Sequence, residues 1–142
     1  MGHLTRLLCS RTVLMALAVA CGACSTSISD ESLTRIDADA VSARLAGEAA
    51  GRTLVVDSRP ATVYRAGHIP SSVNLRLEDV ARGRTHGLAD YPMIVVYGQN
   101  PSSATAIALA KRLTTLGYRG VRLYAGGYDA WVRAGLPIAS DE

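Results

Sequence analysis

The segment VVDSRPATVYRAGHIPSSVNL, residues 55–75, decides the fold class because it joins two apolar runs through a turn and a short helical pattern. Its first residues belong to TLVVD, residues 53–57, a β-branched run without polar alternation that is typical of a strand covered on both faces. Pro60 suits the first turn of a helix, and Gly67 suits its end. SVNL, residues 72–75, then predicts a second strand, so the segment has a strand–helix–strand pattern.

The remainder of the chain continues this alternation. Short apolar runs predict strands, and apolar residues at helical spacing predict helices. The further elements are a helix from Asp37 or Asp39 to Glu48, a short helix in 76–83, a strand at 93–97, a helix at 102–116, a strand at 120–124 and a closing helix in 127–135. Together they predict an α/β fold, with a mostly parallel sheet flanked by helices on both faces.

The composition indicates one compact domain. The chain has 142 residues, and 49% of them are hydrophobic, which is enough for a core although Phe is absent. Two of the fifteen basic residues, Arg6 and Arg11, lie near the start, and from residue 22 onward 13 basic and 12 acidic residues leave a charge of only +1. There is no basic stripe with interleaved aromatic residues, so we expect no nucleic acid partner.

Residues 1–20 are predicted to be a secretory signal peptide. Two arginines flank the start of TVLMALAVA, residues 12–20, an apolar run that is too short to span a bilayer. Cys21 follows Ala, Val and Ala, and this context resembles the lipobox of bacterial lipoproteins, in which the cysteine is lipidated. Cys24 is the alternative lipidation site.

The predicted order is a signal peptide at 1–20, a lipid-anchor cysteine with a flexible tether at 21–36, and a folded domain at 37–142. We therefore expect an exported protein of the bacterial cell envelope, held on a membrane by acyl chains at Cys21. The alternatives are a soluble periplasmic or secreted protein and a protein that keeps an uncleaved N-terminal anchor.

Cysteine positions exclude several kinds of chemistry from the folded domain. All three cysteines, Cys9, Cys21 and Cys24, precede residue 25, so the domain contains no thiol. A disulfide framework, a cysteine-based metal site and a cysteine nucleophile are thereby excluded. The Cys21–Cys24 spacing is that of redox motifs, but no second pair accompanies it, and we interpret it as chance. We expect no cofactor and no metal.

Three motifs carry a resemblance to a known family. They are Asp-x-Arg at Asp57 and Arg59, Gly-His-Ile-Pro at Gly67 to Pro70 with Asn74, and Gly-Gly-x-x-Ala-Trp at Gly126 to Trp131. In this order and spacing they resemble a rhodanese domain, over residues 37–138. The resemblance implies a five-stranded parallel sheet flanked by helices. It also implies transfer of sulfane sulfur from thiosulfate or a persulfide, with the sulfur carried on a cysteine after the central strand.

The sequence departs from the family pattern at that cysteine. Counting from strand 93–97, the family's cysteine position is Gly98, and the usual glycine and arginine of its loop are Pro101 and Ser103. A persulfide needs a thiolate that can attack sulfur and later leave from it, and glycine has no side chain. We therefore expect no catalysis of sulfur transfer by this domain.

The loop offers no convincing replacement nucleophile. Ser102 or Ser103 would need a base within reach, and the domain's histidines are His68 and His86. His68 belongs to the Gly-His-Ile-Pro turn, where it is expected to fix the turn, and His86 is expected to be solvated. The serines fit the start of a helix with Asn100 as cap and Pro101 at its first position.

Binding remains the favoured class of function. The end of a strand followed by a helix N-terminus can expose N–H groups to an anion. The candidate loop consists of Gly98, Gln99, Asn100, Pro101, Ser102 and Ser103, with Arg59 beside it. The leading hypothesis is a non-catalytic module that binds a protein partner or a small oxyanion. The alternatives are a role in envelope sulfur or redox handling, with the reactive thiol supplied by a partner, and an enzyme of unrecognised mechanism.

Overall fold

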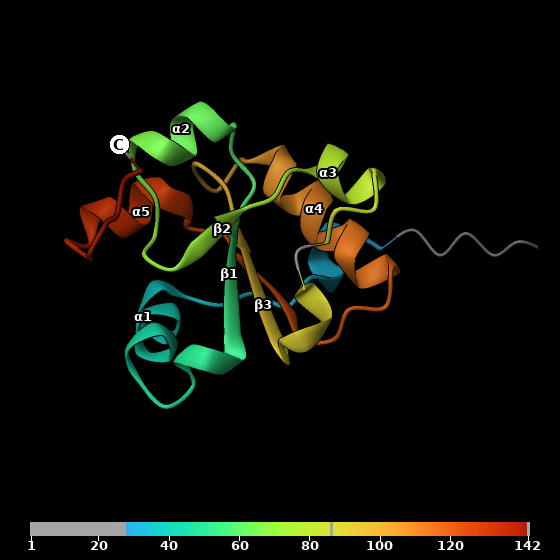
Figure 1. Ribbon diagram of the computed structural model, residues 1–142, viewed down its shortest axis with the longest axis horizontal. Coiled ribbons are helices and arrows are strands. Elements are labelled where there is room, and N and C mark those ends of the chain that lie inside the picture. The colour runs from blue at the N-terminus through green and yellow to red at the C-terminus, as the bar shows by residue number, and fades with distance from the viewer. Residues whose placement is uncertain (1–27, 86, 142) are drawn as a thin grey trace, which may run out of the picture.

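The computed structural model describes residues 28–85 and 87–141, which form a parallel sheet between two layers of helices (Figure 1). The strands are β1 (Thr53–Asp57), β2 (Ser72–Asn74), β3 (Met93–Tyr97) and β4 (Val121–Tyr124). Their order in the sheet is β2-β1-β3-β4, and all pairs are parallel. The α/β class with a parallel sheet is thus confirmed.

The two central strands are apolar because helices cover both of their faces. Val55 pairs with Val95 and Val56 with Val96 across β1 and β3, and all four side chains are buried. Successive side chains of a strand point to opposite faces. Val56 and Val96 accordingly enter one core cluster, while Val55 and Val95 enter the other.

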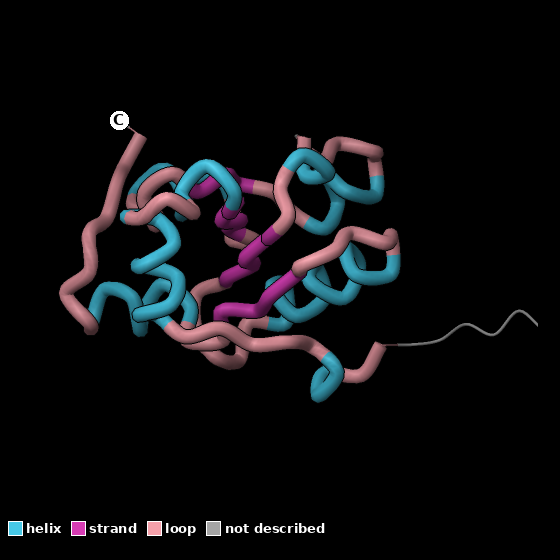
Figure 2. The backbone as a smooth tube through the Cα atoms, turned by 90° about the horizontal axis from the view of Figure 1, so that it is seen from below, coloured by secondary structure: helices cyan, strands magenta, loops and turns pink. Residues whose placement is uncertain are grey.

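The helices occupy separate faces of the sheet. They are α1 (Ala38–Ala46), α2 (Ala61–Ala66), α3 (Leu77–Ala81), α4 (Ala104–Thr115) and α5 (Gly127–Arg133), with short 3-10 turns η1 (Asp30–Ser32), η2 (Ala50–Arg52) and η3 (Leu88–Asp90). Figure 2 shows helices on both sides of the strands, with α3 and α4 on one side and α1 and α5 on the other in Figure 1. Leu109 of α4 lies in the first core, and Trp131 of α5 in the second.

Helix α1 begins where the sequence predicts a cap. Asp37 has extended backbone geometry, and its side chain accepts a hydrogen bond from the N–H of Ala40 at 2.8 Å. This arrangement satisfies one of the donors that a helix start leaves free. The helix ends at Ala46, two residues before the predicted end at Glu48.

Helix α4 begins later than predicted. Its first residue is Ala104, whereas the sequence pattern favours a start at Ser102 with Asn100 as the cap. Residues 99–102 form a bend and turn, and the N-terminal flanking residue of the helix is Ser103. The capping role predicted for Asn100 is wrong, because polar side chains in this segment bond to the turn instead.

The described part of the sheet has four strands, and not the five implied by the family resemblance. The place beside β4 is taken by a single parallel bridge between Arg35 and Leu123. Leu123 donates its N–H to the carbonyl of Thr34, and Ile36 donates its N–H to the carbonyl of Leu123. This short pairing covers the β4 edge without forming a full strand.

Part of the predicted tether therefore packs on the domain. Leu33 is buried in the core beneath α4, and Ile28 packs against the same cluster. The folded part of the chain thus begins upstream of Asp37. The predicted signal peptide and the candidate lipidation sites Cys21 and Cys24 lie outside the described residues. In residues 28–85 and 87–141, no helix combines the length and hydropathy that a membrane span requires.

Candidate functional site

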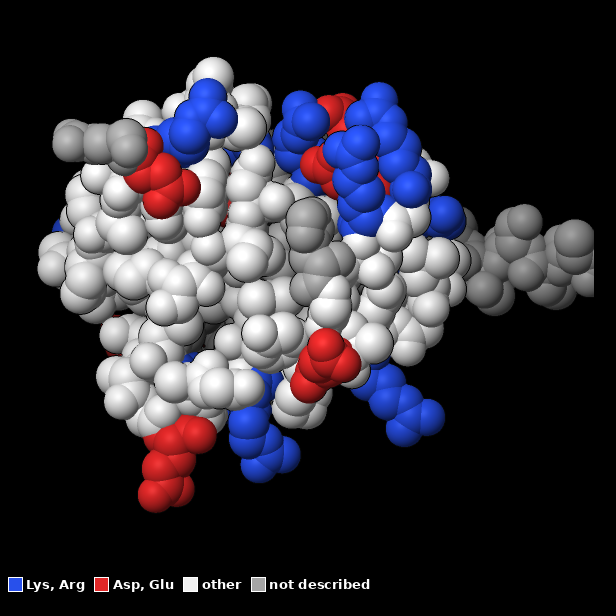
Figure 3. Space-filling view, in the orientation of Figure 1, with Lys and Arg blue, Asp and Glu red and all other residues white. Residues whose placement is uncertain are grey.

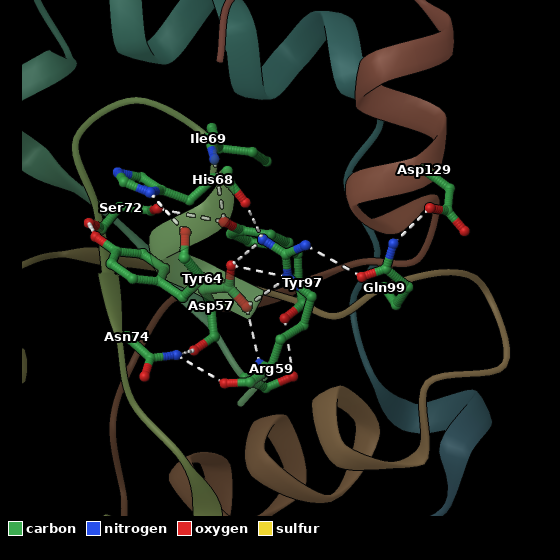
Figure 4. Close-up of polar contacts among 12 residues, drawn as sticks. Asp57, Arg59, Tyr64, His68, Ile69, Ser72, Asn74, Tyr97, Gln99 and Asp129 are labelled. Carbon is green, nitrogen blue, oxygen red and sulfur yellow. Dashed lines mark hydrogen bonds and ion pairs between the residues drawn. The ribbon is translucent and has the colours of Figure 1, made fainter. Parts of the chain in front are cut away.

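Two loops meet at the carboxyl ends of the central strands (Figure 4). Asp57 of β1 is in register with Tyr97 of β3, so the residues that follow them emerge side by side. Ser58 reinforces this junction, because its N–H and its hydroxyl both bond to the carbonyl oxygen of Tyr97, at 3.0 and 2.9 Å. In parallel sheets this edge is where ligands usually bind.

Asp57 and Arg59 form a buried ion pair at the centre of the site. The Nε of Arg59 lies 3.0 Å from each carboxylate oxygen of Asp57, and its Nη2 lies 2.7 Å from Oδ2. The side chains are 4% and 0% exposed for Arg59 and Asp57, respectively. Burial disfavours the charged guanidinium, but the hydrogen bonding and charge of Asp57 outweigh it and raise the pKa of Arg59.

Arg59 also connects the loop after β1 to three other segments. Its Nη2 donates to the carbonyl of Gly67 at 2.6 Å, and its Nη1 donates to Oε1 of Gln99 at 3.1 Å. The guanidinium lies over the ring of Tyr128, 4.1 Å from its centre, where cation–π attraction contributes further. Arg59 is therefore a structural hub, with five side-chain hydrogen bonds to protein atoms.

The start of α5 holds the loop after β3. Tyr128 donates its N–H to the carbonyl of Gly98, and Asp129 donates its N–H to that of Gln99, both at 2.9 Å. The side chain of Gln99 donates to Oδ1 of Asp129 at 2.6 Å. Gly127 permits this approach, because its φ is +67° and a Cβ there would lie 2.7 Å from the backbone of Gln99. The Gly-Gly motif thus serves the packing of α5 against the loop.

Tyr97 and Asn74 fix the backbone around the ion pair. The hydroxyl of Tyr97 accepts the N–H of Ile69 at 3.1 Å, and burial together with the charge of Asp57 raises its pKa. Asn74 donates to the carbonyls of Asp57 and Arg59, at 3.1 and 2.8 Å. The first contact joins the Gly-His-Ile-Pro segment to the end of β3, and the second joins β2 to the loop after β1.

His68 is buried, and its contacts hold the turn in which it lies. Its ring stacks on Tyr64 with 4.0 Å between centres, and its Nδ1 lies 3.0 Å from the carbonyl oxygen of Tyr64. Its Nε2 faces Asp141 at 4.0 Å. Among the described residues, neither Ser102 nor Ser103 hydrogen bonds to a histidine, so no serine–histidine pair is formed in that part of the chain. His86 lies outside the described residues.

The loop after β3 satisfies several of its own polar groups. Ser103 Oγ accepts the N–H of Asn100, Asn100 Oδ1 accepts the N–H of Ser102, and the carbonyl of Asn100 accepts the N–H of Ser103, each at 3.0 Å. Pro101 has no N–H. The N–H groups of Asn100, Ser102 and Ser103 are therefore engaged within the turn.

Ser103 also fills the space next to Gly98. A Cβ placed on Gly98 would lie 2.5 Å from Ser103 Cβ and 2.7 Å from Ser103 Oγ. It would also lie 3.1 Å from Ala106 Cβ, in the first turn of α4. A side chain at residue 98 therefore has no room unless Ser103 and the turn move.

A groove adjoins the loops on the side of α3 and α4. It has a volume of about 500 Å³. Its residues are Ser58, Pro60, Arg76, Leu77, Glu78, Ala104, Thr105 and Ala108. Pro60, Leu77, Ala104 and Ala108 give the lining apolar surface, whereas Arg76 and Glu78 add charged groups. Leu77 is 41% exposed. Within the described residues, no cluster of three or more His, Cys, Asp or Glu side chains could hold a metal ion.

The fold and these loops are those of a rhodanese-like domain. The model of the rhodanese-like domain family matches residues 37–134, and the chain belongs to this family. The match includes both central strands and every motif described above.

Two similar proteins are thiosulfate sulfurtransferases. The GlpE protein of Pseudoalteromonas translucida is 33% identical over 81 residues, which cover 57% of this chain and 74% of that protein. The GlpE protein of Pseudomonas savastanoi pv. phaseolicola is 33% identical over 84 residues, which cover 59% and 76%. The crystal structure of the Alr3790 protein from Anabaena sp. matches with a TM-score of 0.64 and 24% identity, over 74% of this chain and 91% of that chain. The last similarity supports the fold.

The structure brings together only some of the residues that the sequence selects. Arg59 does lie beside Gln99, but its guanidinium is directed into the Asp57 pair and the Gly67 carbonyl. Sequence reasoning missed the bridging role of Gln99 and its partner Asp129. Nothing in their local pattern indicates it, because the two residues are 30 positions apart and meet only through the fold.

Proposed function

We propose that this protein is a non-catalytic rhodanese-like domain, held on a membrane of the bacterial cell envelope by lipid at Cys21, that acts by binding a protein partner. The chain's membership of the rhodanese-like family supports the domain assignment. The signal-peptide pattern and the small residues before Cys21 support the anchor.

The observation that carries the non-catalytic assignment is the packing of Ser103 against Gly98. Sulfur transfer through a persulfide requires a thiolate, and residues 25–142 contain no cysteine. The position that the family resemblance assigns to that cysteine is a glycine whose side-chain space is filled, with Ser103 Cβ 2.5 Å from a placed Cβ. The loop is thus packed for a residue without a side chain.

Protein binding is favoured over binding of a small oxyanion. The N–H groups of Asn100 and Ser102 are taken by side chains of the same turn. The guanidinium of Arg59 is paired with Asp57 and buried. An anion would have to displace these contacts. Separating the buried Arg59–Asp57 pair is costly, because it leaves an uncompensated buried charge.

A second candidate function follows from the two sulfurtransferase relatives. Their 33% identity favours a role near sulfur transfer, in which this domain docks a partner that supplies the reactive thiol. Like the first candidate function, it requires a protein partner, but here the partner must carry a reactive thiol.

Two measurements test the proposed function. The full chain is assayed for thiosulfate:cyanide sulfurtransferase activity beside a GlpE protein as positive control, and we expect no turnover above the blank. Mass spectrometry of the mature N-terminus is expected to show acyl chains at Cys21. Turnover by the wild-type chain would overturn the non-catalytic assignment, and an unmodified or uncleaved N-terminus would overturn the anchor.

A further inference from the structure

The chain joins the domain on the side of α4, and this leaves a much shorter tether than the sequence predicts. Asp30 of η1 forms an ion pair with Lys111 of α4. Ile28 packs on the core cluster that α4 covers, and Leu33 is buried in it. In both Figure 1 and Figure 2 the first described residues lie beside α4. The start of the domain is therefore fixed to one helical face.

The remaining tether restricts which surface can meet a membrane. Only residues 22–27 separate Cys21 from Ile28. A fully extended chain advances at most about 3.5 Å per residue, so this segment reaches about 25 Å. A domain of this size is about 35 Å across, as its expected radius of gyration indicates. An acylated Cys21 therefore keeps the side that carries η1 and α4 close to the bilayer.

That side carries a cluster of arginines. Figure 3 shows Lys and Arg atoms gathered over the region of α3, with acidic atoms among them. Arg76 pairs with Glu78 and Asp79, and Arg84 pairs with Asp79, whose side chain is only 13% exposed. Arg84 is 62% exposed and Arg76 is 40% exposed, but Glu78 is 52% exposed as well. The charges of Arg76 and Arg84 are thus balanced by Glu78 and Asp79, and a net positive charge on this side requires further cations.

Two further cations on the same side have no ion-pair partner among the described residues. Arg82 follows α3 and is exposed. Arg112 is exposed on α4, one helical turn after Ala108, which lines the groove between α3 and α4. Residues four apart share a helix face, so Arg112 lies on the face of α4 that borders this groove. Leu77, at the groove wall, is 41% exposed and adds an apolar contact.

We propose that the α3–α4 face, meaning the exposed surface of η1, α3 and α4 with Arg82, Arg84 and Arg112, rests on the membrane and contacts anionic phospholipid headgroups. The proposal rests on the proposed lipid anchor at Cys21. Arginines near an anionic bilayer are attracted to its phosphates, and the short tether supplies the proximity. The α1–α5 face then points away from the bilayer and is free for a protein partner.

Residues 25–142 contain no cysteine, so one introduced cysteine can be labelled selectively to measure how close its helix lies to the membrane. The full chain carries Cys24→Ser and either Ala81→Cys on α3 or Ala43→Cys on α1. Both are exposed helical alanines on opposite faces of the sheet. Each lipidated protein is labelled with a fluorophore and placed in vesicles of phosphatidylcholine and phosphatidylglycerol that contain a headgroup-bound quencher. The α3 label is expected to be quenched severalfold more than the α1 label.

The outcomes separate the inference from the proposed function. If mass spectrometry shows no acyl chain at Cys21, the anchor itself fails. If the protein is acylated and both labels are quenched equally or not at all, the anchor stands and the orientation is wrong. Stronger quenching of the α1 label would also overturn the inference, and the α3–α4 face would then be open to an acidic protein partner instead.

A charge reversal tests the role of the arginines. Arg82→Glu with Arg112→Glu is expected to reduce quenching of the α3 label severalfold in anionic vesicles. Arg44→Glu with Arg52→Glu, near α1, is the matched control and is expected to leave it unchanged. In vesicles of phosphatidylcholine alone, which carry no net charge, the two double variants should show the same quenching of the α3 label. The same is expected at high salt, because salt screens exposed charges. If both double variants changed the quenching of the α3 label equally in anionic vesicles, the proposed contact of the α3–α4 face with lipid headgroups would be wrong.

Discussion

Ser103 occupies the space into which a side chain at Gly98 would extend. A Cβ on Gly98 would lie 2.5 Å from Ser103 Cβ, and Ser103 is held in place because its Oγ accepts the N–H of Asn100. The end of β3 and the start of α4 thus pack closely because residue 98 has no side chain. The loop after β3 is therefore packed for a residue without a side chain at position 98.

The first prediction concerns this packing. Gly98→Ala should lower the free energy of unfolding by about 1–3 kcal/mol, because the new methyl overpacks the loop. Ser103→Gly in the same chain should restore part of that loss. Chemical denaturation of the single and double variants measures both effects. Gly51→Ala is the control, since a Cβ there meets no atom within 4 Å. Equal effects at residues 51 and 98 would contradict the packing.

The second prediction concerns the buried ion pair. Arg59→Ala should destabilise the fold by about 3–5 kcal/mol, because it leaves the carboxylate of Asp57 buried without its partner. Arg76→Ala removes ion pairs whose arginine is 40% exposed, and it should cost only about 0–1 kcal/mol. Urea unfolding of the two variants provides the comparison. A small effect at Arg59 would show that this pair is not the hub of the site.

The third prediction concerns Gln99 as the link between Arg59 and α5. Gln99→Ala removes hydrogen bonds to Arg59 and Asp129 and should cost about 1 kcal/mol. Hydrogen exchange should accelerate for the amides of residues 98–103, while the amides of β1 remain protected. Val63→Ala, at an exposed position of α2, is the control. Unchanged exchange in the loop would mean that backbone bonds to α5 alone hold it.

The fourth prediction concerns alkaline pH. Burial and then Asp57 raise the pKa of Tyr97, so its neutral form is stabilised in the folded state. Its contribution is complete below the unfolded pKa of about 10 and is lost as pH rises toward the higher folded value. Tyr97→Phe should destabilise the protein at neutral pH, because the N–H of Ile69 loses its acceptor. The stability gap between wild type and variant should narrow above about pH 10. A gap that is constant with pH would contradict the assignment.

Most of the fold could be predicted because its signals are local. The apolar runs at 53–57 and 93–97 are strands in the structure, as their lack of alternation predicts, and Asp37 caps α1. The pairing at Arg35 was missed, since Thr34, Arg35 and Ile36 form no apolar run and follow a segment rich in serine. Their position is determined by the exposed edge of β4, which is a tertiary feature.

The position of the candidate site could be predicted from the sequence, but the conformation of the loop after β3 could not. The register of β1 and β3 puts Arg59 beside Gln99, as expected for adjacent parallel strands. The start of α4 was misplaced because Asn100, Pro101 and Ser102 are equally good residues for a helix start and for a turn. In the structure, Asn100 and Ser103 form hydrogen bonds within a turn, and Ser103 fills the space beside Gly98. No local sequence pattern indicates that packing.

The non-catalytic function is tested by measuring the thiosulfate:cyanide sulfurtransferase activity of the wild-type chain and of Gly98→Cys. We expect no turnover from either protein, because the wild type has no thiol in the domain and the variant has no room for one beside Ser103. Circular dichroism is expected to show that the variant used in the assay is folded. Turnover by the wild type would contradict the non-catalytic function, and turnover by Gly98→Cys would contradict the closed packing of the loop.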